Sequence, residues 1–146
     1  MADVLTGSCR RLEELPSAAR AIVEDARRAV LSTLDENGIP HTVPVTFAIV
    51  AGVLVTAIDH KPKSGRELKR MKNLRANPVA TMLVDRWSEE WDELGWVMLS
   101  GRAHIELPGT GVAQLTERYP QYRRQAPTGD VIVFNPERIR WWLASG

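Results

Sequence analysis

The sequence has little of what several large classes of protein depend on. Cys9 is its single cysteine among 146 residues, so no disulfide can form within the chain and a cysteine-rich metal cluster is excluded. The three histidines, His41, His60 and His104, lack the spacing of a metal site, and no Gly-x-Ser-x-Gly motif is present. A chain without an obvious acid, base or nucleophile is expected to borrow its chemistry from a cofactor.

Long apolar runs and an excess of one charge are also missing. No hydrophobic run approaches the length of a membrane span, and residues 1–15 carry charges where a signal peptide needs an apolar stretch. The net charge is only +1, and acidic residues at 89–93 balance a basic stretch at 61–75, which does not favour a nucleic-acid partner. We therefore expect a cytoplasmic protein with neither a membrane nor a nucleic acid as its partner.

The chain length and its pattern predict one mainly β domain over residues 1–146, with residues 1–15 as an irregular N-terminal segment. Alternating or β-prone runs predict seven strands: Ala29–Leu34, His41–Val50, Val53–Ile58, Val79–Asp85, Trp96–Leu107, Val131–Phe134 and Ile139–Leu143. Helical spacing and end signals predict three helices: Pro16–Arg28, one that begins after Ser64 and stops before Asn77, and Val112–Tyr119. Short connections and the lack of a glycine-rich phosphate loop favour an antiparallel barrel over a doubly wound parallel sheet.

The first candidate site is a polar loop that leads into the second predicted helix. Ser64 and Glu67 have the spacing of a capping box, and a helix N-terminus offers unpaired N–H groups to an anion. Lys61 and Lys63 in the loop before it would add two charges, which together make a phosphate site.

The predicted helix continues this basic character. Lys69 and Asn73 fall at helical spacing with Arg66 and Arg70, opposite an apolar stripe, so the four would share one face. The same pattern is equally consistent with a solvated helix face.

The second candidate site is the strand that contains His41, Pro44, Val45 and Thr46. Pro44 cannot donate to the hydrogen-bond ladder, which leaves neighbouring backbone groups free for the heteroatoms of a planar ligand. The alternative is an edge strand that its proline protects from aggregation.

Tryptophan is abundant, and most of it lies near one segment. Three tryptophans lie in or beside the acidic segment 86–95, and two more follow near the C-terminus: Trp87, Trp91, Trp96, Trp141 and Trp142. They could form a ligand wall or a subunit interface.

The order of several motifs resembles the pyridoxamine-phosphate-oxidase-like split-barrel family, from about Ala18 onwards. The motifs are VLSTL at 30–34, HTVPVTF at 41–47, KPK at 61–63 and LKRMKNLRANP at 68–78. Within that family the chain looks most like the deazaflavin-dependent branch, because of Val84–Asp85 before the acidic tryptophan segment, GRA at 101–103 and RYPQYR at 118–123.

The resemblance implies an FMN-binding-type split β-barrel, antiparallel with a few short helices (α+β), which dimerises and binds its cofactor in grooves between the subunits. Lys61 and Lys63 would then bind the phosphate with Lys69 and Asn73 as supplements. His41, Pro44, Val45 and Thr46 would contact the ring, and Phe47 would point into the core.

The function implied is hydride transfer between a deazaflavin, coenzyme F-420 (8-hydroxy-5-deazaflavin), and a small electron-poor organic substrate. Such a ring carries the transferable hydride itself, so the protein mainly aligns donor and acceptor. Two alternatives stay open: an FMN-dependent flavin reductase or oxidase of the same fold, and a protein that binds a flavin, deazaflavin or haem-like ring without turnover.

Overall fold

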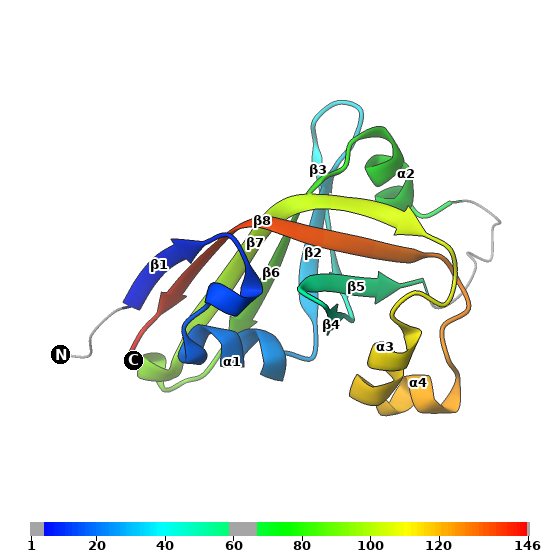
Figure 1. Ribbon diagram of the computed structural model, residues 1–146. Coiled ribbons are helices and arrows are strands. Elements are labelled where there is room, and N and C mark those ends of the chain that lie inside the picture. The colour runs from blue at the N-terminus through cyan, green and yellow to red at the C-terminus, as the bar shows by residue number, and fades with distance from the viewer. Residues whose placement is uncertain (1–4, 59–66, 146) are drawn as a thin grey trace.

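The computed structural model describes residues 5–58 and 67–145, which form a strongly curved antiparallel sheet with short helices around it (Figure 1). The strands are β1 (Leu5–Cys9), β2 (Ala29–Leu34), β3 (Pro40–Val45), β4 (Ala48–Val50), β5 (Val53–Ala57), β6 (Val79–Arg86), β7 (Gly95–Glu106) and β8 (Val131–Leu143). The helices are α1 (Ser17–Asp25), α2 (Lys69–Ala76), α3 (Val112–Arg118) and α4 (Pro120–Arg124), with short 3-10 turns η1 (Leu12–Glu14) and η2 (Trp91–Glu93).

The strand order shows how the sheet curls. Its path is β3-β2-β6-β7-β8-β5-β4, and β1 pairs with the C-terminal half of β8 beyond the end of β5. The two ends of this path, β3 and β4, are joined along the chain by only Thr46 and Phe47. Since two residues cannot span an open sheet of this width, the sheet must bring its ends together. This curled, antiparallel, mainly β architecture with short helices confirms the predicted fold class.

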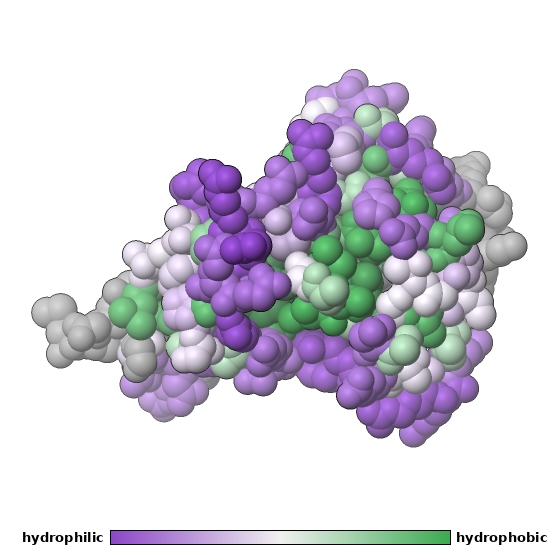
Figure 2. Space-filling model, viewed as in Figure 1, coloured by the Kyte–Doolittle hydropathy of each residue, from purple (hydrophilic) through white to green (hydrophobic). Residues whose placement is uncertain are grey.

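Two apolar clusters hold the curled sheet together. The larger one lies inside the curl, where Phe47, Leu99 and Phe134 are fully buried and α1 contributes Ile22 and Val23. The smaller one lies where α3 and α4 pack on β4, β5 and β8. The helix pair contributes Leu115 from α3, Tyr122 from α4 and Tyr119 from between them. In the view of Figure 2, apolar side chains also gather on the surface over β4 and β5.

The predicted irregular N-terminal segment is wrong for its described part. Leu5–Cys9 forms β1, paired with β8 from Leu5 opposite Leu143 to Cys9 opposite Ile139, and η1 follows it. The strand's side chains are mostly small and polar, so its local pattern is weak. Its position depends on the free edge of a strand more than 100 residues away.

Other boundaries shift where distant contacts intervene. The predicted strand His41–Val50 is broken after Val45, because the amide N–H of Phe47 is donated to the Tyr119 hydroxyl at 3.1 Å and not to a ladder partner. The predicted inward orientation of Phe47 is confirmed, since its side chain has 0% exposure.

At the C-terminal end the two predicted strands are one. β8 runs unbroken through Asn135–Pro136. The register with β7 shifts there, because Ser100 lies opposite Arg138 and Gly101 opposite Pro136, which leaves one extra residue on β8. Pro120, expected only to end a helix, also begins α4, where its missing N–H is tolerated at the first helical position.

The start of α2 also differs from the prediction. The helix begins at Lys69 after Leu68, so Glu67 lies before it and forms an ion pair with Arg75, with 2.5 Å between Oε1 and Nε. Ser64, the predicted cap, lies outside the described residues.

Within the part of the chain that the structure describes, no helix combines the length and apolar character that a membrane crossing requires.

Candidate functional site

A pocket of about 250 Å³ lies where the end of β3, β5 and α2 meet. One wall is continuous in sequence and consists of Pro44, Val45 and Thr46. The opposite side comes from distant segments: Arg28 before β2, Thr56 and Ala57 on β5, and Arg70 on α2. Closing the sheet is therefore what assembles the pocket.

The wall formed by Pro44, Val45 and Thr46 lies at the free edge of the sheet. Among the described strands, β3 is an end strand whose one partner is β2, with Pro44 opposite Val30. A proline without an N–H is tolerated at such an edge. The predicted edge position of the strand is confirmed, and protection from aggregation by Pro44 stays a prediction. The chain then leaves the sheet at Thr46, which turns this half-buried hydroxyl toward the pocket.

The polar lining of the pocket has a definite chemistry. Arg28 and Arg70 supply two guanidinium groups, and Thr46 and Thr56 supply two hydroxyls. Guanidinium groups match phosphate and carboxylate geometry, while threonine hydroxyls can donate or accept a hydrogen bond. Val45 and Ala57 keep the rest apolar. The pocket thus suits a ligand with an apolar ring and an anionic end.

Three of the predicted site residues meet in this pocket, namely Pro44, Val45 and Thr46. His41 lies earlier on β3, opposite Thr33, outside the pocket. Its Nδ1 atom is buried and has no hydrogen-bond partner among the residues that the structure describes. Lys61 and Lys63 lie outside the described residues.

The two predicted supplements on α2 have other partners. Asn73 is only 5% exposed and donates from its side-chain amide to the hydroxyl of Thr33 at 3.0 Å, so it does not share an exposed face with Lys69. Lys69 lies 3.8 Å from a carboxylate oxygen of Asp35 in the turn between β2 and β3. The backbone N–H of Ile39, supported by that of Asn37 and by Lys69, holds the pKa of Asp35 below its ordinary value.

Sequence reasoning missed Arg28, Thr56 and Arg70 as a group. Thr56 is a buried hydroxyl within an apolar strand, and such a residue is a recognisable signal. The sequence predicts Arg70 only as part of a basic helix face. Nothing local distinguishes Arg28, since it becomes part of the site only through the turn that leads from α1 into β2.

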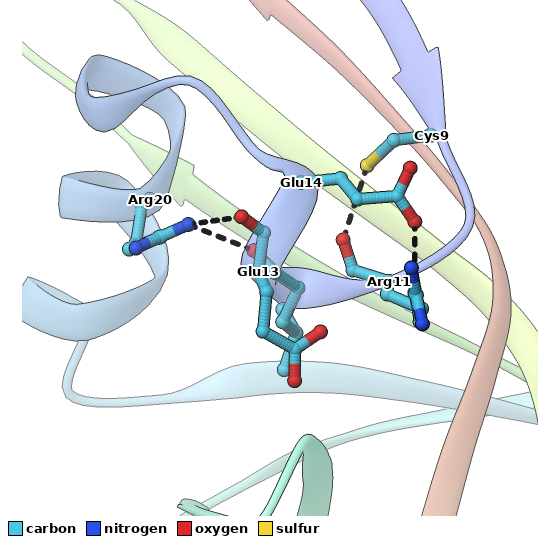
Figure 3. Close-up of polar contacts among 6 residues, drawn as sticks. Cys9, Arg11, Glu13, Glu14 and Arg20 are labelled. Carbon is cyan, nitrogen blue, oxygen red and sulfur yellow. Dashed lines mark hydrogen bonds and ion pairs between the residues drawn. The ribbon is translucent and has the colours of Figure 1, made fainter.

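A wider hollow, of about 1120 Å³, lies between η1 and β8. Two of its lining residues, Arg11 and Glu14, form an ion pair at 3.1 Å. Figure 3 also shows Arg20, outside the lining, which donates to the carbonyl of Glu13 at 2.6 Å. Burial, with the nearby charge of Glu14, raises the pKa of the Cys9 thiol. A protonated thiol is a poor nucleophile, so this hollow is a weaker candidate for chemistry.

Residues 15–143 match the model of a family described as pyridoxamine 5'-phosphate oxidase. No curated protein matches the chain. Within the described residues, no group of three histidine, cysteine, aspartate or glutamate side chains is placed to hold a metal ion.

Several solved structures share the fold at low sequence identity. The conserved hypothetical protein Rv2991 of Mycobacterium tuberculosis aligns with a TM-score of 0.69 and 21% identity over 89% of this chain and 86% of its own. A haem-binding protein of Mycobacterium smegmatis aligns with a TM-score of 0.65 and 23% identity, over 90% of this chain and 55% of its own. An FAD-binding protein of Mesorhizobium loti aligns with a TM-score of 0.62 and 18% identity, over 96% of this chain and 98% of its own.

Proposed function

Because the chain belongs to the pyridoxamine 5'-phosphate oxidase family, we propose that it is an oxidoreductase. Its reaction is hydride transfer between the deazaflavin coenzyme F-420 and a small electron-poor organic substrate. The observation that carries the proposal is the pocket at the end of β3, which combines an apolar wall, two threonine hydroxyls and two arginines.

The residues of the pocket fit a ring with a phosphate-bearing tail. Arg28 and Arg70 would hold the phosphate through charge-assisted hydrogen bonds. Thr46 and Thr56 would orient the heteroatoms of the ring, which would lie along Pro44 and Val45. When bound, a deazaflavin supplies the transferable hydride on its own ring carbon, so the chain needs only to align the ring and exclude water. We keep Lys61 and Lys63 as further proposed phosphate ligands on the sequence evidence alone.

The pocket of one chain is too small for a whole coenzyme. Its volume of about 250 Å³ is below the roughly 300–1,000 Å³ of most cofactor pockets. We therefore propose that a second copy of the chain completes the site.

The sheet offers a surface for that second copy. A row of side chains crosses its outer face from Pro44 through Val30 and Leu83 to Met98, each opposite the next on neighbouring strands. Leu83 is 37% exposed, and Val30 and Met98 are half-buried, so no described element of the chain covers this row. Pro44 belongs both to the row and to the pocket, so a partner packed on the row would adjoin the ligand.

The test is a titration of the purified protein with oxidised and reduced F-420 and with FMN, followed by tryptophan fluorescence. Arg28→Ala and Arg70→Ala should each weaken binding by about 1–3 kcal/mol, the range for loss of a charge-assisted hydrogen bond. Arg124→Ala is the matched control, because Arg124 is exposed at the end of α4 and outside the pocket. A protein that binds none of these rings would contradict the proposal.

A second candidate is a flavin enzyme or a carrier that binds its ring without turnover. The solved neighbours that bind FAD and haem favour it as an alternative. Tight binding of FMN, without binding of F-420, would select the flavin form. Binding of either ring without hydride transfer to any enone or quinone acceptor would select the carrier.

A further inference from the structure

Two tyrosine hydroxyls reach from the α3–α4 pair to the short link between β3 and β4. Tyr122, on α4, lies 2.7 Å from Thr46, measured between the two hydroxyl oxygens. Tyr119, between the two helices, accepts the backbone N–H of Phe47 at 3.1 Å. Both tyrosines are buried, with 6% and 7% exposure. Two consecutive residues of the link are therefore held by two hydroxyls more than 70 positions later in the chain.

The same helix pair also holds the segment that carries Arg28. The Tyr119 hydroxyl donates to the backbone carbonyl of Arg27 at 3.0 Å, and the Arg27 guanidinium lies over the Tyr119 ring at 4.6 Å from its centre. Arg27 in turn donates to the backbone carbonyl of Arg118 at 2.8 Å. Arg27 directly precedes Arg28. The α3–α4 pair therefore fixes the backbone beside two lining residues of the pocket, Arg28 and Thr46.

The two tyrosines act on the pocket in different ways. The Tyr119 hydroxyl bonds the backbone groups of Phe47 and Arg27, so it stabilises the backbone conformation of these two segments. Tyr122 contacts the side-chain oxygen of Thr46, which itself lines the pocket. A hydroxyl has one hydrogen to donate. If Thr46 donates it to Tyr122, Thr46 can only accept a hydrogen bond from a ligand, and if Thr46 accepts from Tyr122, its own hydrogen is available to the ligand.

We propose that Tyr122 is a positioning residue that fixes the rotamer and the hydrogen-bonding role of the Thr46 hydroxyl, and so helps to determine which ring atoms the pocket accepts. This inference rests on the proposed function. Replacing Tyr122 with Phe keeps the aromatic packing in the smaller cluster but removes the hydrogen bond to Thr46. The Thr46 hydroxyl can then rotate and act toward a ligand as a hydrogen-bond donor or as an acceptor.

A double-mutant cycle tests the assignment, with Tyr122→Phe, Thr46→Val and the combined variant. Dissociation constants for F-420 and for FMN are measured by tryptophan fluorescence, and the thermal unfolding midpoint is measured without ligand. Tyr122→Phe should weaken binding about 2- to 12-fold, which corresponds to the net value of one hydrogen bond. Thr46→Val should weaken it at least as much. The combined variant should bind no more weakly than Thr46→Val alone, because Tyr122 acts through Thr46.

Tyr119→Phe serves as the control, since it is the same change three residues away and removes a hydroxyl that bonds the backbone groups of Phe47 and Arg27. Because its hydroxyl bonds the Phe47 backbone and not the Thr46 side chain, its effect on binding should persist in the Thr46→Val background, and hydrogen exchange at the Phe47 amide should become faster. If Tyr122→Phe lowers the unfolding midpoint and leaves both dissociation constants unchanged, Tyr122 is merely structural and the assignment is wrong. Additive effects of Tyr122→Phe and Thr46→Val would overturn it as well. Failure of the wild-type protein to bind either ring would instead overturn the proposed function, and this inference with it.

Discussion

Single residues show how closely the long β7–β8 hairpin is packed. At Gly101, where the register of the hairpin shifts, an added Cβ atom would overlap the backbone oxygen of Asn135. Backbone cannot move aside as a flexible side chain can, so Gly101→Ala should lower the free energy of unfolding by about 1–3 kcal/mol. Urea unfolding measures this. Ser100→Ala, on the same strand but half-buried on its outer face, should change stability by only about 0.5 kcal/mol.

Asp35 gives a pH-dependent prediction at the same scale. Its Oδ1 atom accepts the N–H groups of Asn37 and Ile39, at 2.8 and 2.9 Å, and these bonds close the β2–β3 turn. Because its pKa is lowered in the folded state, the charged form adds stability above the ordinary aspartate pKa. That stability is lost as the pH falls through the lowered folded-state pKa.

Asp35→Asn should therefore be less stable than the wild type near neutral pH, and the difference should shrink in acid. Thermal unfolding of both proteins across this pH range checks the prediction. A difference that stays constant down to pH values at which carboxylates are protonated would contradict it.

At the scale of elements, α2 is anchored on the sheet by a buried polar contact. Asn73 donates to Thr33 from the inner face of the helix, and both side chains are almost fully buried. Asn73→Ala removes the donor and should cost about 1–3 kcal/mol of stability. Where the variant is folded, its affinity for F-420 or FMN should equal that of the wild type, because Asn73 lies outside the pocket. A loss of affinity without a loss of stability would restore Asn73 as a ligand residue.

The elements that the sequence predicts well are those whose pattern is local. β2 has the predicted bounds, because Ala29–Leu34 is a short β-prone run, and the structure buries Ala29, Leu31 and Thr33 on its inner face. β1 has no comparable pattern and forms through pairing with β8. The break between β3 and β4 depends on Tyr119, which lies 72 positions away.

The candidate site also has a part that a local motif predicts and a part that only the fold brings together. Its continuous wall, Pro44 to Thr46, follows from one short motif that could be recognised in the sequence. Arg28, Thr56 and Arg70 belong to three segments that meet only when the sheet closes. Prediction from local patterns therefore finds one wall of the pocket and misses the residues opposite it.

At the scale of the whole molecule, the outer sheet face and the small pocket lead to one prediction about assembly. The wild-type protein should sediment at twice its chain mass of 16.3 kDa. Leu83→Glu places a charge in the row that a second copy would cover, and a buried unpaired charge is costly. This variant should sediment as a monomer.

Leu107→Glu is the matched control, because Leu107 is 80% exposed and lies after the end of β7, outside the row. It should stay dimeric. Since the proposed site needs both copies, Leu83→Glu should also lose most of its affinity for F-420 and FMN while keeping a cooperative unfolding transition, whereas Leu107→Glu should keep that affinity. A monomeric Leu83→Glu protein that binds the ring as tightly as the wild type would show that one chain forms the complete site, and the dimer would then have no part in binding.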